Sequence, residues 1–228
     1  EKILNPISIV KKDKKIRLGY YSADFYNHAM SYLLAGLFKQ HDKSKFELFA
    51  FSFGPEKNDE MSKKIPNYFN DFVKVNFKTD KEIAEISRNL KIDIAIDLLC
   101  FTTNNRMGIF SERCAPIQVN YLGYPGTSGT NFIDYIIADK ILIPKESQKY
   151  YSEKIIYLPN TYQARDSSLK ISDKIFKREE LGLPKNAFVF CCFNQNNKIT
   201  PNIFDIWMKI LKTVDKSVLW LLEDNSIA

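Results

Sequence analysis

A short strand followed at once by a glycine-rich loop is the feature that most limits what this chain can fold into. Residues 117–122 read Ile-Gln-Val-Asn-Tyr-Leu, and residues 123–129 contain three of the chain's eight glycines. Glycine permits positive φ and lets a ligand approach the backbone, whereas Pro125 fixes its own φ and removes a donor. Open α/β sheets bind ligands at such turns, at the carboxyl ends of strands. The loop is therefore a candidate binding loop, with a tight crossover turn as the alternative.

Strands alternate with helical patterns over residues 16–158, which indicates a parallel sheet. Residues 92–99 are almost continuously apolar, as in a parallel strand that is covered on both faces. One expected helix has apolar residues at the helical period over 30–38, and the next begins with a capping box at 79–82. The other strands are expected over residues 16–22, 46–53, 71–77, 134–139 and 154–158. We therefore predict an α/β fold with a doubly wound parallel sheet.

A second β-α-β pattern follows a polar stretch over residues 161–186, which we interpret as a linker. The helix of this pattern, over 202–214, has an apolar stripe that we expect to be buried, namely Ile203, Phe204, Trp207, Ile210, Leu211 and Val214. Strands are expected on either side of it, over residues 188–193 and 217–222. The two domains are therefore expected at 1–160 and 187–228. The second has fewer strands than a Rossmann-like domain needs, so we expect it to be incomplete.

Composition and motif content argue against several other classes of protein. The net charge is +6, but the lysines are spread along the chain and form no basic stripe with interleaved aromatics. The four cysteines have no Cys-x-x-Cys spacing, and His28 and His41 are the two histidines, so a metal site is not expected. No apolar run is long enough to span a bilayer, and the first residues do not resemble a signal peptide. We expect a cytoplasmic protein that binds no nucleic acid, membrane or metal.

The turn after the first expected strand contains two residues that could move a proton. Asn27 is a plausible N-cap, which would place His28 in the first turn of the helix, where the macrodipole disfavours a charged imidazole. A neutral imidazole can accept a proton, and Asp24 precedes it on the same rim of the sheet. The alternative is that Asp24 caps a turn and His28 is an ordinary helical residue.

A lysine precedes the helix of the second pattern. Thr200 suits the N-cap and Pro201 suits the first helical position, so the helix N-terminus is expected there. Lys198 lies two residues before this cap, and a point charge beside a helix dipole suits a diphosphate. Lysines before helices are also common without any such function.

Several stretches of the chain resemble motifs of the O-GlcNAc transferase/SPINDLY family of protein glycosyltransferases. They are Asp-Phe-Tyr-Asn-His at 24–28, Ala-Pro-Ile-Gln at 115–118, Leu-Gly-Tyr-Pro-Gly-Thr-Ser-Gly at 122–129 and Phe-Asn-Gln-Asn-Asn-Lys-Ile-Thr-Pro at 193–201. Tyr-Ser-Glu-Lys at 151–154 resembles the bacterial members. The resemblance runs from about Ile16 to the last residue. The chain departs from the family at Leu99 and Cys100, which replace an Asn-Gly pair, while Thr102 remains.

The resemblance implies a GT-B type fold with two Rossmann-like domains, the first nearly complete and the second truncated. It implies inverting transfer of N-acetylglucosamine from UDP-GlcNAc to Ser or Thr hydroxyls of proteins, without a metal or other cofactor. It also implies the roles of the site residues. Asp24 or His28 would relay the acceptor proton, Lys198 would neutralise the leaving diphosphate, Gly123 and Pro125 would shape the sugar pocket, and Gln195 and Thr102 would contact substrate.

Three alternatives remain open at this stage. Some members of the family use GDP-fucose as the donor. The replacement of the family's Asn-Gly pair by Leu99 and Cys100 favours a non-catalytic module that binds proteins. The motif residues Asp24, His28 and Lys198 are nevertheless present. Nucleic-acid binding through the positive charge is the weakest alternative.

The resemblance also implies segments that these 228 residues do not contain. Tetratricopeptide repeats that recruit protein acceptors are expected upstream, and the loop and acid that hold the nucleoside are expected downstream. We therefore expect residues 1–228 to lack transfer activity on their own.

Overall fold

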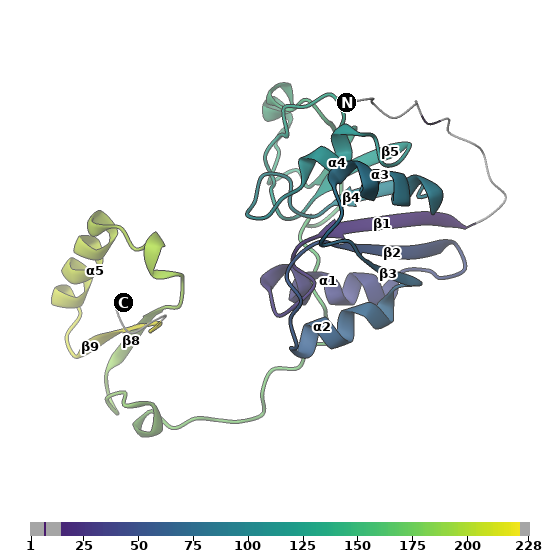
Figure 1. The fold of residues 1–228 in the computed structure, drawn as a ribbon. Helices are drawn as coiled ribbons and strands as arrows, with labels where there is room; N and C mark the ends of the chain where they lie inside the picture. Colours follow the sequence, from purple (N-terminus) through teal and green to yellow (C-terminus); the bar gives the residue numbers. More distant parts are fainter. Residues whose placement is uncertain (1–6, 8–14, 224–228) are drawn as a thin grey trace. The chain divides into compact units, whose positions relative to one another are not determined.

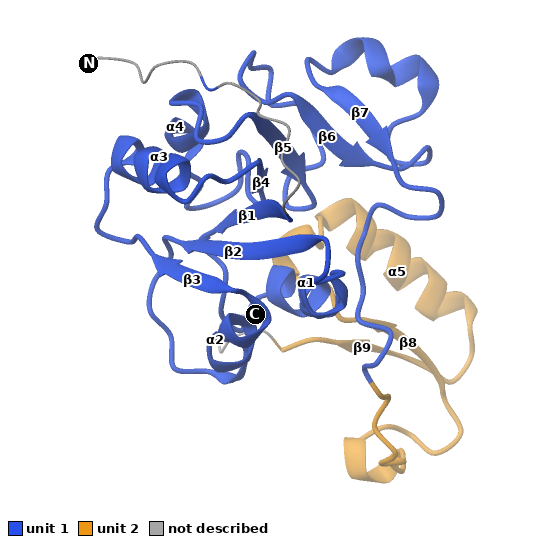
Figure 2. Cartoon of the chain, turned by 90° about the vertical axis from the view of Figure 1, so that its right-hand side faces the viewer, with its two compact units in different colours: residues 1–169 blue, residues 170–228 orange. Residues whose placement is uncertain are grey.

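The computed structural model describes residue 7 and residues 15–223. The chain divides into two compact units, residues 1–169 and residues 170–228 (Figure 1, Figure 2). The division falls within the stretch expected to be a linker.

Unit 1 is built on one seven-stranded parallel sheet. Its strands are β1 (Ile16–Ser22), β2 (Phe46–Ser52), β3 (Asp71–Lys74), β4 (Ile94–Asp97), β5 (Ile117–Tyr121), β6 (Tyr135–Ala138) and β7 (Lys154–Tyr157). Their order is β3-β2-β1-β4-β5-β6-β7, and every neighbouring pair is parallel. The predicted parallel α/β sheet is confirmed. The strand order reverses between β1 and β4, which is where such sheets form a ligand crevice.

Helices cover both faces of this sheet. Helices α1 (Ala29–Gln40) and α2 (Glu60–Lys64) lie on one face, and α3 (Asp80–Asn89) and α4 (Met107–Ser111) lie on the other (Figure 1, Figure 2). Each pair of helices closes its own apolar core against the strands. The core on the α1 face includes the fully buried Phe38, and the core on the α3 face includes the fully buried Phe51. The capping box at the start of α3 is present, with Thr79 as the N-cap. Short 3-10 helices, η1 (Ile65–Tyr68) and η2 (Lys145–Tyr150), complete the unit.

The third strand is shorter than expected. It ends at Lys74, whereas the sequence pattern extends it to Phe77. Phe77 lies in the turn before α3 and is 99% exposed, so its aromatic character does not reflect burial in the sheet. The strand prediction is therefore wrong over residues 75–77.

Residues after β7 remain attached to unit 1. The Tyr121 hydroxyl donates to the Tyr162 carbonyl oxygen at 2.8 Å, and the Tyr162 N–H donates to Asp139 Oδ2 at 2.8 Å. Gly36 of α1 lies against Asp166, because a Cβ added at Gly36 would lie 2.8 Å from the Asp166 Cα. The polar segment after β7 thus crosses α1 before the chain leaves the unit.

Unit 2 contains the second β-α-β pattern. Strands β8 (Phe188–Cys192) and β9 (Ser217–Leu221) are parallel, and helix α5 (Pro201–Thr213) lies between them in the chain. The 3-10 helix η3 (Glu179–Leu181) precedes β8, and η4 (Asn196–Lys198) precedes α5. Thr200 caps α5 and Pro201 is its first residue, as predicted.

The apolar stripe of α5 is less buried than expected. Trp207, Leu211 and Val214 are half-buried, whereas Ile203, Phe204 and Ile210 are 38–40% exposed. Among the described residues the sheet of unit 2 has only two strands, which leaves part of the apolar face of the helix exposed. The prediction of a buried stripe is wrong for the exposed residues. Within the same described ranges, no helix is long and apolar enough to cross a bilayer.

Candidate functional site

Three segments leave the sheet side by side at the point where the strand order reverses. The last paired residues of β1, β4 and β5 are neighbours across the sheet. The turn 22–28 follows β1, the turn 98–102 follows β4, and the loop 122–129 follows β5. These segments carry the site residues predicted in unit 1, namely Asp24, His28, Thr102, Gly123 and Pro125.

Asp24 is buried in the turn after β1, where several hydrogen bonds fix it. Its backbone N–H donates to Ser22 Oγ at 2.9 Å, its carbonyl oxygen accepts from Ser31 Oγ at 2.6 Å, and its carboxylate accepts from Tyr26 Oη at 3.3 Å. Burial raises the pKa of Asp24 above its usual range, against the opposing effects of His28 and of the Tyr26 hydroxyl. A carboxylate of raised basicity is suited to taking up a proton.

His28 is the N-cap of α1, which corrects the prediction that Asn27 has this role. The backbone of His28 is extended, with φ −139° and ψ 152°, and its Nδ1 accepts from the Met30 N–H at 3.3 Å. Because Nδ1 is the acceptor, the neutral ring carries its proton on Nε2. Nδ1 also lies 3.6 Å from Asp24 Oδ2. The structure thus brings Asp24 and His28 into one cluster.

Asn27 ties this turn to the start of α2 instead. Its Oδ1 accepts from the Met61 N–H at 3.1 Å, and its own N–H donates to Asp59 Oδ2 at 3.0 Å. Asp59 is the N-cap of α2 and forms a capping box with Ser62. Asn27 therefore satisfies the N-terminus of a neighbouring helix and leaves the cap of its own helix to His28.

The turn after β4 is closed by Asp97. Asp97 Oδ1 accepts from the Leu99 N–H at 3.0 Å, and the Thr102 hydroxyl donates to the Leu99 carbonyl oxygen at 2.9 Å. Cys100 has φ +49°, a left-handed conformation that favours glycine, at the position where the family motif has one. Cysteine thus occupies a backbone conformation that glycine adopts more readily. Thr102 holds the same turn, and its contact with substrate stays a prediction.

The buried Asp97 carboxyl should make the stability of the chain depend on pH. Burial raises the pKa of Asp97 from 3.8 to about 6, against the hydrogen bonds from Leu99 and Cys100. The folded state therefore binds this proton more tightly than the unfolded state. As the pH rises from the usual pKa to about 6, the free energy of unfolding falls, and above that range Asp97 changes it no further. Between about pH 4.5 and pH 7.5 we expect the wild type to lose about 2 kcal/mol of unfolding free energy relative to Asp97→Asn. Urea unfolding of both proteins at both pH values measures this, and a pH-independent difference would contradict it.

The glycine-rich loop is packed closely against the turn after β4. A Cβ added at Gly123 would lie 2.0 Å from the Leu98 carbonyl oxygen, so this position requires glycine for close approach. Within the loop, Asn120 Nδ2 donates to the carbonyl oxygens of Tyr124 at 3.0 Å and Gly126 at 3.3 Å. Pro125 lies between these two anchored residues. The loop therefore has a defined shape, and the roles of Gly123 and Pro125 toward a sugar stay predictions.

The remaining predicted residues, Gln195 and Lys198, are exposed in unit 2. The Lys198 N–H donates to the Gln195 carbonyl oxygen at 3.0 Å, within the turn that leads into α5. Thr200 Oγ1 accepts from the Ile203 N–H at 3.4 Å. In the part of the chain that the structure describes, no carboxylate forms an ion pair with Lys198. Its charge is thus available at the start of α5.

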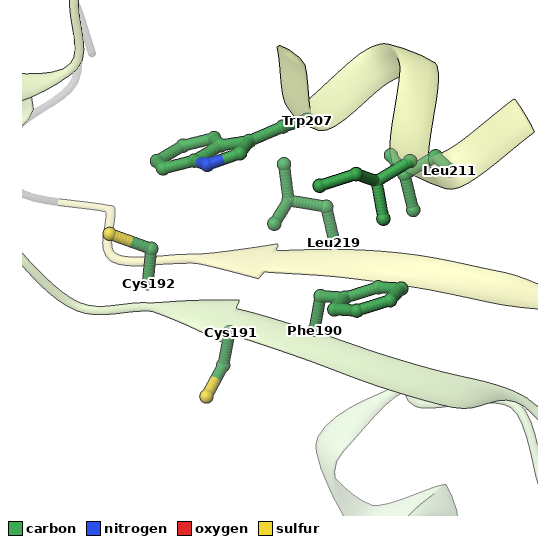
Figure 3. Close-up of a pocket in the computed structure, with 7 residues that line it drawn as sticks. Phe190, Cys191, Cys192, Trp207, Leu211 and Leu219 are labelled. Carbon is green, nitrogen blue, oxygen red and sulfur yellow. The ribbon is translucent and has the colours of Figure 1, made fainter. Parts of the chain in front are cut away.

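An apolar cavity of about 280 Å³ lies between α5 and the two strands of unit 2. It is lined by Phe190, Cys191, Cys192, Trp207, Ile210, Leu211 and Leu219, and the side chain of Cys191 points to the other face of β8 (Figure 3). None of the predicted site residues lines it. Among the described residues, no group of three or more His, Cys, Asp or Glu side chains is placed to hold a metal ion.

A family model described as glycosyl transferase family 41 matches residues 3–173 and 164–226. The chain belongs to glycosyl transferase family 41. It is 38% identical over 214 residues to a probable UDP-N-acetylglucosamine–peptide N-acetylglucosaminyltransferase, SEC, of Arabidopsis thaliana, covering 92% of this chain and 22% of that protein. It is 31% identical over 211 residues to the A. thaliana protein named SPINDLY with the same enzyme description, covering 91% of this chain and 23% of that protein.

Solved structures agree with this assignment. The Thermobaculum terrenum O-GlcNAc transferase, in a mutant form, matches with a TM-score of 0.79 and 27% identity, over 95% of this chain and 41% of that chain. A lipopolysaccharide outer core galactosyltransferase, WaaB, shares the fold with a TM-score of 0.52 at 14% identity, over 92% of this chain and 62% of that chain. The resemblance found in the motifs and the predicted GT-B type α/β fold are both confirmed. This family member spans less than a quarter of the length of the two Arabidopsis relatives.

Proposed function

We propose that this chain carries part of the catalytic region of an inverting glycosyltransferase that moves N-acetylglucosamine from UDP-GlcNAc to Ser or Thr hydroxyls of proteins. The observation that carries this proposal is the Asp24–His28 cluster, which lies at the reversal of strand order in a chain of family 41. A buried carboxylate of raised basicity beside an imidazole nitrogen is suited to accepting the proton of a hydroxyl nucleophile.

In this scheme the acceptor oxygen attacks the anomeric carbon while the bond from that carbon to the diphosphate breaks. The hydroxyl proton passes to the Asp24–His28 cluster, and UDP leaves with the bonding electron pair. If His28 Nδ1 takes the proton, it gives up the hydrogen bond that it accepts from the Met30 N–H and becomes a cation 3.6 Å from Asp24 Oδ2, which stabilises it. Charge builds on the leaving diphosphate, which Lys198 and the positive end of the α5 dipole, with the Asn202 N–H, would stabilise. We propose no role for a metal or other cofactor.

The comparisons support UDP-GlcNAc over GDP-fucose as the donor. Both Arabidopsis relatives carry UDP-N-acetylglucosamine in their names, and identity is higher to the SEC protein, at 38%, than to the SPINDLY protein, at 31%. From the resemblance of the motifs to the family we also propose a cytoplasmic enzyme of bacterial type with protein acceptors, and tetratricopeptide repeats elsewhere in the gene product to recruit them.

A transfer assay on the protein expressed from its complete gene tests the proposal. The protein is incubated with a Ser/Thr peptide and either UDP-GlcNAc or GDP-fucose, and the peptide mass is measured. We expect a mass increase of one N-acetylhexosamine with the first donor and none with the second. Transfer of fucose would overturn the donor assignment. Peptide binding without transfer from either donor would instead support a non-catalytic binding module.

A further inference from the structure

The segment just before β7, residues 151–153, holds the glycine-rich loop by hydrogen bonds. Glu153 Oε1 accepts from the Ser128 N–H at 2.6 Å and from the Ser128 hydroxyl, and Glu153 Oε2 accepts from Thr127 Oγ1 at 2.8 Å. The Ser152 N–H donates to Thr127 Oγ1 at 3.1 Å. The Tyr151 hydroxyl donates to the Pro125 carbonyl oxygen at 3.0 Å. Three consecutive residues therefore bind a stretch of loop some 25 residues earlier in the chain.

The carboxylate of Glu153 is buried against the loop. Glu153 is only 4% exposed, and a buried carboxylate is costly unless donors surround it. Although burial opposes ionisation, the donors from Ser128 and Thr127 hold the pKa of Glu153 below its usual range. Over residue 7 and residues 15–223, Glu153 forms no salt bridge to Lys, Arg or His. Its negative charge is therefore balanced by the loop itself.

The first part of the same loop is held by strand β5 and by the turn after β4. Asn120 of β5 donates to the carbonyl oxygens of Tyr124 and Gly126, and Gly123 packs on the turn after β4. Glu153 and Tyr151 act on the far end, at residues 125–128. Anchors at both ends fix the loop before a ligand arrives, which is the arrangement that a preorganised binding loop requires.

We infer that Glu153 is a positioning residue that holds the loop 122–129 in the shape that binds the donor sugar, with Tyr151 as a secondary anchor. This inference rests on the proposed function, because it assigns the loop to the donor. Glu153 acts through Ser128 and Thr127 and does not itself contact the reacting atoms.

Steady-state kinetics of the protein from the complete gene test the assignment to the donor. We expect Glu153→Ala to raise the KM for UDP-GlcNAc at least tenfold with little change in the KM for the acceptor peptide. Glu153→Gln keeps one acceptor oxygen and should recover part of the loss, and Tyr151→Phe should raise the donor KM only a few-fold. Glu146→Gln, an exposed glutamate of η2, is the matched control and should behave as the wild type. A fall in kcat with both KM values unchanged would show a merely structural role and overturn the inference.

Hydrogen exchange separates failure of this inference from failure of the proposed function. We expect Glu153→Gln to accelerate amide exchange at least tenfold over residues 126–129, with the exchange of the β1 and β4 amides unchanged. Unchanged exchange in the loop would overturn the inference even in an active enzyme. A wild-type protein that transfers no sugar would refute the proposed function and, with it, the assignment of the loop to a donor.

Discussion

Gly54→Ala is expected to destabilise the chain by about 3 kcal/mol, because the new methyl group would overlap backbone that cannot move aside. A Cβ at Gly54 would lie 1.7 Å from the Ala23 carbonyl oxygen and 2.8 Å from the Ala23 Cα. Ala23 is 1% exposed and continues directly into Asp24, so relief of the overlap must shift the turn that carries Asp24. Loss of stability and displacement of the candidate site are therefore expected together.

Gly129→Ala is the matched control for this prediction. Gly129 has φ +63° and no atom within 4 Å of an added Cβ, so the cost there is that of the left-handed backbone conformation alone, about 1 kcal/mol. Urea unfolding of both variants gives the two free energies. If Gly54→Ala costs no more than Gly129→Ala, the close approach of Gly54 to Ala23 does not constrain the fold.

Local sequence patterns predicted most of the sheet, because each buried parallel strand is a short apolar run with a helix or turn on either side. The pattern predicts residues 16–22 as the first strand, and β1 has these bounds. The pattern failed where an apolar residue is exposed. Phe77 extends the third strand in the sequence but lies in a turn, and Ile203, Phe204 and Ile210 of the α5 stripe are 38–40% exposed.

The sequence predicted which residues form the candidate site, but not the contacts that hold them in place. Asp24 and His28 are four positions apart, so a single turn brings them together. The partners of Asn27 and Glu153 lie 25–34 residues away, and no local pattern contains such contacts. Asn27 is the better N-cap by residue preference alone, yet its contact with Met61 directs it to α2 and leaves the cap to His28. Tertiary contacts thus overrode local preference at the site itself.

Lys198→Ala, in the protein expressed from the complete gene, is expected to lower kcat for transfer from UDP-GlcNAc about 100- to 1,000-fold, the usual cost of losing one preorganised charge-stabilising group. Lys198 lies in the turn just before the capped start of α5, and in the described part of the chain no carboxylate pairs with it. Its ammonium charge and the positive end of the helix dipole would therefore act on the same leaving diphosphate. Lys198→Arg keeps the charge and should retain more activity than Lys198→Ala.

Lys209→Ala is the matched control, since Lys209 is an exposed lysine of the same helix that lies away from its N-terminus. We expect it to transfer sugar at the wild-type rate, and we expect all variants to bind the acceptor peptide equally well. Kinetics and peptide binding together then decide between two interpretations of the chain. If Lys198→Ala abolishes transfer but not peptide binding, Lys198 acts on the chemical step of an enzyme. If Lys198→Ala and Lys209→Ala transfer sugar at the same rate, the charge of Lys198 has no part in the departure of UDP. The charge on the leaving diphosphate must then be stabilised by the N-terminus of α5 or by residues elsewhere in the protein.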